Sequence, residues 1–178
     1  LPISSAMLDD GRVEELSSGR DRGAGIRVVV GETTGFAHTA DLSEEGLRAA
    51  AEAAAAAARS GGGGVREVAL TRREAPRPND VAVLPETVAK GAKVELLRRA
   101  DEAARSAGGA VRQVRARYGD SRRRILVANS EGVLAEDDQV RTLFVVSAVA
   151  VGDTGMQTGY ESLGRTVGFE LFDRYDVD

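Results

Sequence analysis

The chain has 178 residues, no cysteine, and a net charge of −4 from 28 acidic and 24 basic side chains. This length suffices for one domain with a sizeable core, and the acidic balance argues against a general nucleic-acid binder. No apolar stretch has membrane-spanning length, and the lack of cysteine excludes a disulfide scaffold and is compatible with a reducing, cytoplasmic location.

The first forty residues are predicted to form an antiparallel meander of four strands. Residues 3–8 and 12–17 flank Asp10-Gly11, a strong turn signal. Residues 25–30 and 35–39 flank a second turn. The run 26–30 is β-branched and apolar on both faces apart from Arg27. It therefore predicts a strand covered on both faces, within a buried hairpin that the rest of the chain must cover.

Two helices are predicted next. Ser43 is a typical N-cap with acidic residues in the first turn after it, and the first helix runs through an alanine tract to about Ser60. Its alanine surface favours a helix lying flat on the meander over a partner-binding helix. Residues 65–70 predict a strand and 76–85 a loop. The second helix is predicted over residues 89–107, because apolar side chains recur on one face: Val94, Leu97, Ala100, Ala104 and Ala107.

The rest of the chain is predicted to be rich in β-structure. Residues 111–118 alternate in polarity as a strand does, Gly119-Asp120-Ser121 predicts a turn, and 124–128 predict the returning strand. A second turn, 129–132, precedes a strand at 133–136. Residues 140–151 are largely apolar on both faces and predict a central strand buried on both faces, paired with 154–166. Together these elements predict an α+β fold, an antiparallel sheet with two helices packed on one face.

Three segments carry a family resemblance. They are Gly23-x-Gly25-Ile-Arg-Val followed by Gly35-Phe-Ala-x-Thr, Leu-Leu-Arg-Arg-Ala-Asp at residues 96–101, and Val-Gly-Phe-Glu at residues 167–170. In these segments the chain, from about residue 11 to 172, resembles the amino-terminal domain of the TldD/PmbA family. That family comprises cytoplasmic zinc metalloproteases and their partners, once described as modulators of DNA gyrase. The resemblance implies a single domain over residues 1–178, truncated at both ends and followed elsewhere by a catalytic domain.

The resemblance also implies what this chain lacks. The family's proteases bind zinc through a His-Glu-x-x-x-His helix and a later cysteine in the carboxy-terminal domain, whereas this sequence has one histidine and no cysteine. No catalytic, metal-binding or cofactor-binding residue can therefore be carried over, and the chain alone is expected to bind no zinc and to be inactive. In the family two subunits associate around the active site. A second TldD/PmbA-type subunit, in a homo- or heterodimer, and a peptide substrate are thus the implied partners.

Several residues have the chemistry of a possible binding site. His38 without other soft ligands is a poor zinc site and reads as a surface or hydrogen-bonded histidine. Gly23-x-Gly25 precedes a strand and Gly61 to Gly64 follow a helix, so both lack the context of a phosphate-binding loop and are structural. The acidic run Glu136-Asp137-Asp138 could attract a hard cation but lacks regularly spaced oxygen ligands, so it is predicted to be a solvated turn.

Two functions remain open. The leading hypothesis is a non-catalytic amino-terminal domain of a TldD/PmbA-type metalloprotease, which assists subunit assembly and access of unfolded peptides to the zinc site of the catalytic domain. Exposed edge strands would offer a route for such pairing. The alternative is a stand-alone binding module that recruits a protein or nucleic acid through a predicted basic hairpin. Its arginines are Arg115, Arg117, Arg122, Arg123 and Arg124. A zinc motif downstream of this sequence would favour the first.

Overall fold

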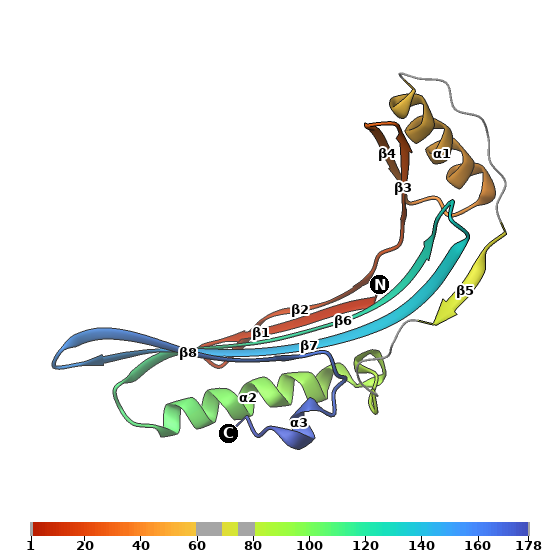
Figure 1. Ribbon diagram of the computed structural model, residues 1–178. Coiled ribbons are helices and arrows are strands. Elements are labelled where there is room, and N and C mark those ends of the chain that lie inside the picture. The colour runs from red at the N-terminus through yellow and green to blue at the C-terminus, as the bar shows by residue number, and fades with distance from the viewer. Residues whose placement is uncertain (1, 60–68, 75–80, 178) are drawn as a thin grey trace. The chain divides into compact units, whose positions relative to one another are not determined.

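The computed structural model describes residues 2–59, 69–74 and 81–177, and it confirms the α+β class. Most of the described chain is antiparallel sheet, accompanied by two long helices, α1 (Glu44–Ala58) and α2 (Lys90–Ser106) (Figure 1). The contacts divide the chain into two compact units where the sequence predicts one domain. Unit 1 comprises residues 1–20, 72–127 and 134–178, and unit 2 comprises residues 21–71 and 128–133.

The main sheet of unit 1 has the strand order β2-β1-β6-β7-β5, and β8 also pairs with β7. Its strands are β1 (Pro2–Asp9), β2 (Arg12–Arg20), β5 (Thr71–Glu74), β6 (Val111–Ala128), β7 (Val133–Gly152) and β8 (Gly155–Arg165). The predicted turn between β1 and β2 is confirmed, since Asp10 and Gly11 have φ of 52° and 79°. The predicted pairing of β7 with a polar, glycine-containing strand is also confirmed.

The predicted turn at Gly119-Asp120-Ser121 is wrong. Strand β6 runs through these residues without a break, and they pair with Ser5, Ser4 and Ile3 of β1. Small and polar residues are typical of turns, but here their backbone groups form hydrogen bonds with the neighbouring strand β1. The next turn is confirmed, because Gly132 has φ of 85° and the Asn129 N–H donates to the Val133 carbonyl at 3.1 Å.

Helix α2 covers one face of the unit 1 sheet. The residues that meet in this core are Ala6, Leu8, Leu96, Leu97, Ala100, Ala116, Tyr118 and Phe144. The predicted helix face is confirmed at its centre, but Lys93 and Asp101 are buried there too while Ala107 is exposed. The short helix α3 (Leu171–Arg174) adds Leu171 and Phe172 to the same side, where the rings of Phe172 and Phe144 meet edge to face at 5.6 Å.

Strand β7 is internal to the sheet, as predicted, but it is not buried on both faces. Val140, Thr142 and Phe144 are buried, whereas Arg141 and Leu143 are exposed and residues 145–150 are half-buried. The apolar run cannot distinguish one-sided from two-sided burial, because that depends on which elements cover the sheet. No described helix of unit 1 other than α2, the one-turn η1 (Pro85–Thr87) and α3 is available to cover it.

Unit 2 is built from a two-stranded sheet and α1. Strands β3 (Ala24–Val30) and β4 (Thr33–Thr39) pair only with each other among the described residues, so they do not continue the meander of β1 and β2. The Ser43 N-cap is confirmed, since its Oγ accepts from the Gly46 N–H at 3.1 Å. The alanine helix lies flat on the hairpin, as predicted, with Ala50, Ala54 and Ala58 buried.

The hairpin of unit 2 is not buried on both faces as predicted. Its side chains alternate between half-buried and exposed, and Val29 and Phe36 are 59% and 61% exposed on the face opposite α1. A single helix covers a single face of a two-stranded sheet. Residues 61–64, most of the predicted strand 65–70 and residues 76–80 of the predicted loop lie outside the described residues.

Candidate functional site

Three elements of unit 1 bring a buried polar cluster together. Lys93 of α2 points its amine at Asp120 of β6, with 2.6 Å between Nζ and Oδ2, and both side chains are 5% exposed. The same amine donates to the Ser4 hydroxyl of β1 at 2.8 Å, and that hydroxyl donates to Asp120. The ammonium also lies 5.1 Å from the centre of the Tyr118 ring. This cluster fastens α2 to two strands.

The cluster is structural in character. A serine beside a lysine can act as a nucleophile when the amine is free to take its proton, but Asp120 holds this amine as a buried ion pair. Burial, and then the neighbouring Asp120 carboxylate, raise the pKa of Tyr118 far above its usual range, so this phenol stays protonated. Sequence reasoning missed the cluster because its members are far apart in the chain, and because Lys93 and Asp120 each stand among other charged residues.

The residues proposed as possible metal ligands do not come together. His38 is exposed and stacks on Phe36 with ring centres 6.3 Å apart. The acidic run lies in strand β7, so the predicted solvated turn is wrong. Glu136 pairs with Arg72 at 2.8 Å and Asp138 with Arg122 at 2.6 Å. No group of three His, Cys, Asp or Glu side chains converges within residues 2–59, 69–74 and 81–177.

The predicted basic hairpin does not exist. Its five arginines lie along the single strand β6, and because side chains alternate, Arg115, Arg117 and Arg123 face one side while Arg122 and Arg124 face the other. Arg115 donates to Asp9 with 3.0 Å between Nε and Oδ2. Arg122 donates to Asp138 and to Glu86, and these carboxylates raise its pKa. Acidic neighbours on the strands and on η1 thus offset part of this charge.

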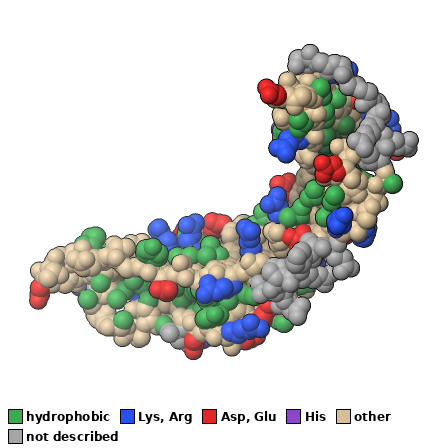
Figure 2. All heavy atoms as spheres, viewed as in Figure 1, with side chains coloured by type: hydrophobic (Ala, Val, Ile, Leu, Met, Phe, Trp, Pro, Cys, Tyr) green, Lys and Arg blue, Asp and Glu red, His purple; other side chains and the backbone are tan. Residues whose placement is uncertain are grey.

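Two exposed strands, β2 and β8, lie at edges of the unit 1 sheet. Every residue of β2 is exposed. Strand β8 pairs with β7 on one side and with no other described strand, and ten of its eleven residues are exposed, including Met156 at 71% and Tyr160 at 77%. Hydrophobic side chains are visible at the surface of unit 1 in the region of β7 and β8 (Figure 2). An uncovered edge strand presents unpaired N–H and C=O groups and can accept a further strand.

The chain matches two family models, one in each part of the sequence. Residues 84–178 match the PmbA/TldA metallopeptidase central domain and residues 4–58 match PmbA/TldA metallopeptidase domain 1. The chain belongs to the PmbA/TldD metallopeptidase family. The resemblance of the glycine-rich hairpin and of residues 96–101 and 167–170 is thereby confirmed.

Curated relatives in this family are longer proteins. A metalloprotease of Methanothermobacter thermautotrophicus is 34% identical over 98% of this chain, and a TldD homologue of Haemophilus influenzae is 29% identical over 94%. The chain spans 38% and 35% of their lengths. The family implies a metal in the full protein. The single histidine, the lack of cysteine and the dispersed carboxylates of the described residues do not fit a zinc site here.

Two solved structures share the fold of this chain. TldE of Thermococcus kodakarensis has a TM-score of 0.68 and 18% identity, with 93% of this chain and 38% of that one covered. A protein of Thermotoga maritima, described as a candidate modulator of a DNA gyrase, has a TM-score of 0.73 and 18% identity, with 93% and 37% covered. At this identity the likeness concerns the fold. No described helix is both long and apolar enough to cross a lipid bilayer.

Proposed function

We propose that this chain is a non-catalytic part of a PmbA/TldD-type metallopeptidase, which works in the cytoplasm and assists both subunit assembly and access of unfolded peptides to a zinc site elsewhere in the parent protein. The observation that carries the proposal is the outer edge of β8, which no other described strand covers and where a long exposed strand adjoins apolar side chains. A free strand edge binds extended backbone with little regard to sequence. That property suits an unfolded substrate.

The family match supports the metallopeptidase context of this proposal, because the models matched are domain 1 and the central domain. The placement of the possible metal ligands among the described residues supports the proposal that this chain is non-catalytic. Hydrolysis by a zinc peptidase requires three protein ligands around the metal, and the side chains that could serve lie apart or are paired with arginines. The proposal therefore assigns binding and assembly to this chain and chemistry to another region of the parent.

The experiment for this proposal is binding of unfolded protein. A fluorescently labelled, permanently unfolded peptide mixture, such as a reduced and alkylated protein digest, should raise anisotropy on titration with the chain, while a folded protein of similar size should not. Sedimentation across a hundredfold concentration range should show weak self-association of the chain. When a second family subunit is added, the chain should form a tighter complex with it. A chain that binds no unfolded peptide and remains monomeric with that subunit would contradict the proposal.

The alternative, a stand-alone module that recruits a protein or nucleic acid through the five arginines of β6, has less support. The arginines divide between two faces of one strand, and Arg115 and Arg122 are paired with carboxylates. Of the three arginines on one face, Arg115 is paired with Asp9, and this carboxylate offsets part of the positive charge that would attract phosphates.

A further inference from the structure

An apolar groove lies beside strand β8, on the face of the unit 1 sheet that α2 covers. Its floor is formed by two cross-strand pairs, Phe144 with Leu163 and Val146 with Glu161. One wall is the alanine side of α2, formed by Ala100, Ala103 and Ala104. The segment after α3 closes the groove with Asp176 and Val177. The volume is about 380 Å³, at the lower end of the range of small-ligand sites. It can therefore accept one or two side chains.

The charged side chains that line the groove are both acidic. Asp176 has a partner, since Arg99 Nη2 lies 3.1 Å from its Oδ1. Glu161 is exposed and has no ion pair within the described part of the chain. An apolar surface with a carboxylate at its border favours a ligand that combines apolar area with a positive charge, and it disfavours an anionic one.

The groove adjoins the edge of β8 that pairs with no described strand. This edge favours a ligand in extended conformation. A strand added to β8 would hydrogen-bond through its backbone, and its side chains would alternate between the two faces of the sheet. Every second residue would then point to the groove side, next to Leu163 and Glu161. The residues between them would lie on the opposite face, next to Tyr160 and Ser162.

We propose that the β8 edge and this groove together bind an extended peptide segment that carries an apolar residue and, two positions away, a lysine or arginine. The apolar side chain enters the groove near Leu163, and the cation pairs with Glu161. This inference rests on the proposed function, because it assumes a peptide ligand, and it deepens that function by naming the class of peptide.

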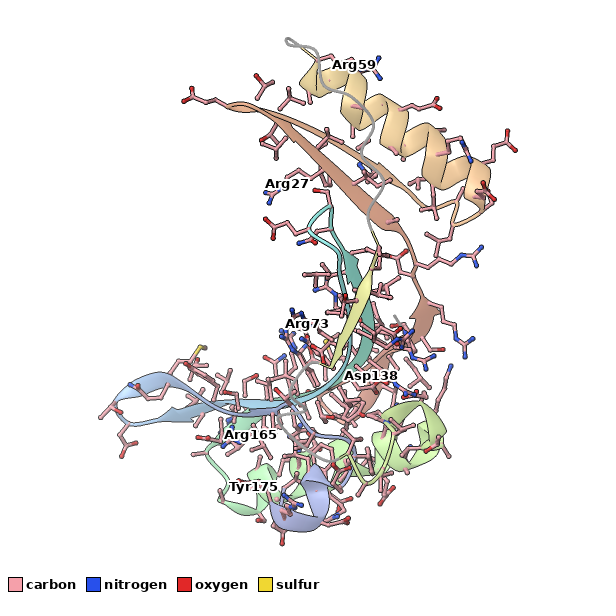
Figure 3. All side chains as sticks on the ribbon, turned by 45° about the vertical axis from the view of Figure 1, so that its right-hand side comes forward. Arg27, Arg59, Arg73, Asp138, Arg165 and Tyr175 are labelled. Atoms are coloured by element: carbon pink, nitrogen blue, oxygen red, sulfur yellow. The ribbon has the colours of Figure 1, made fainter. Side chains whose placement is uncertain are left out.

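A second copy of β8 is a weaker occupant than such a peptide. Glu161 could pair with Arg165 of a second copy, but Arg165 is already engaged in its own chain. Its guanidinium donates to the Gly164 carbonyl at 2.7 Å and lies 5.7 Å from the centre of the Tyr175 ring (Figure 3). Pairing between copies would have to break these contacts, whereas a free peptide brings an unengaged cation.

The test uses the full 178-residue chain and a set of short labelled peptides in fluorescence anisotropy. The parent peptide is threonine-rich, with a leucine and a lysine two residues apart. One comparator replaces the lysine by glutamate, and another is N-methylated at alternate backbone positions, so that it cannot extend the sheet. The variants are Glu161→Lys, Ala104→Phe to fill the groove, and Ser162→Lys as the control, which places the same side chain on the other face of β8.

We expect the lysine peptide to bind at least about fivefold more tightly than the glutamate peptide. Glu161→Lys should reverse that preference, Ala104→Phe should weaken the lysine peptide, and Ser162→Lys should do neither. N-methylation should abolish binding. Circular dichroism melts of the variants establish that each remains folded, which is expected because Glu161 and Ser162 are exposed.

Each contrary result has a distinct meaning. If all the peptides that are not N-methylated bind equally and Glu161→Lys changes nothing, the groove is not the site, but peptide binding at a strand edge stands. If no peptide binds, both this inference and the proposed peptide role fail. If sedimentation shows that copies pair through β8 and exclude the peptide, a second copy is the occupant and the inference is overturned.

Discussion

The Lys93 amine and the Asp120 carboxylate form a buried ion pair, 2.6 Å apart, that joins helix α2 to strand β6. Removing one partner of a buried pair leaves an uncompensated charge, which costs about 3–5 kcal/mol, whereas replacing both by apolar side chains is often neutral. Lys93→Met should therefore lower the free energy of unfolding by about that amount. The double variant Lys93→Met/Asp120→Leu should recover most of it.

Urea unfolding followed by circular dichroism measures these differences. Lys90→Met is the matched control, because Lys90 begins the same helix and is exposed. It should change stability by no more than about 0.5 kcal/mol. Equal effects of Lys93→Met and Lys90→Met would mean that the buried pair does not hold α2 in place.

Gly35 marks the closest approach of α1 to its sheet. A Cβ added at this position would lie 2.0 Å from the Ala54 carbonyl oxygen and 2.7 Å from the Ala58 nitrogen, both backbone atoms that cannot turn aside. Gly35→Ala should therefore push α1 from β4 and destabilise unit 2 by about 1–3 kcal/mol. Hydrogen exchange of the α1 amides should accelerate.

The control for this substitution is Gly91→Ala in α2. A Cβ there would meet nothing within 4 Å, and alanine favours a helix over glycine by about 0.5–1 kcal/mol. Stability should stay the same or rise slightly. Unchanged exchange of the α1 amides in Gly35→Ala would show that the helix does not lie against β4 as described.

Glu170 should make unit 1 sensitive to acid. Burial raises the pKa of this carboxyl, but the backbone N–H groups of Val83 and Gly168, each 2.9 Å from a carboxylate oxygen, outweigh that effect and hold the pKa below its usual value. A carboxyl with a lowered pKa in the folded state stabilises the protein above its unfolded pKa. That stability is lost as the pH falls through the folded value.

The corresponding measurement is the free energy of unfolding between neutral pH and about pH 3. The wild-type chain should lose stability below the usual pKa range of glutamate, near 4.5. Glu170→Gln should be less stable than the wild type at neutral pH, and the gap should close in acid. A gap that is constant across the whole range would exclude ionisation of Glu170 as its source.

The sequence predicts elements well where the signal is local. The turn at Asp10-Gly11, the Ser43 cap and the helical spacing of Leu97 and Ala100 depend on neighbours in the chain, and all three are found in the structure. Continuity of β6 through Asp120 depends instead on a lysine 27 residues away, which compensates the buried carboxylate. The residues next to Asp120 in the sequence do not indicate that Lys93 is its partner.

Burial of the two apolar strands was over-predicted because it, too, depends on elements that are distant in the sequence. Residues 26–30 and 140–151 are apolar on both faces, yet each strand is covered by a helix on one face, and Val29 and Leu143 are 59% and 48% exposed. Apolar residues on an uncovered face are typical of surfaces that meet a partner. The over-prediction therefore falls on the surfaces that are available for binding, and the candidate edge at β8 could be located only once the strand order was known.

Arg122 and Arg123 are adjacent in β6 but lie in different surroundings. Arg122 is 22% exposed and lies between two carboxylates, with Nη1 2.8 Å from Glu86 and Nη2 2.6 Å from Asp138. Arg122→Met would leave both acids without this partner and should cost about 1 kcal/mol or more. The neighbouring Arg123 is exposed on the other face, so Arg123→Met should stay within about 0.5 kcal/mol of the wild type. Neither variant should change binding to a single-stranded oligonucleotide at low salt, which we expect to be negligible. Salt-dependent binding that falls in Arg123→Met but not in Arg122→Met would instead support an arginine face on β6 as a recruitment surface.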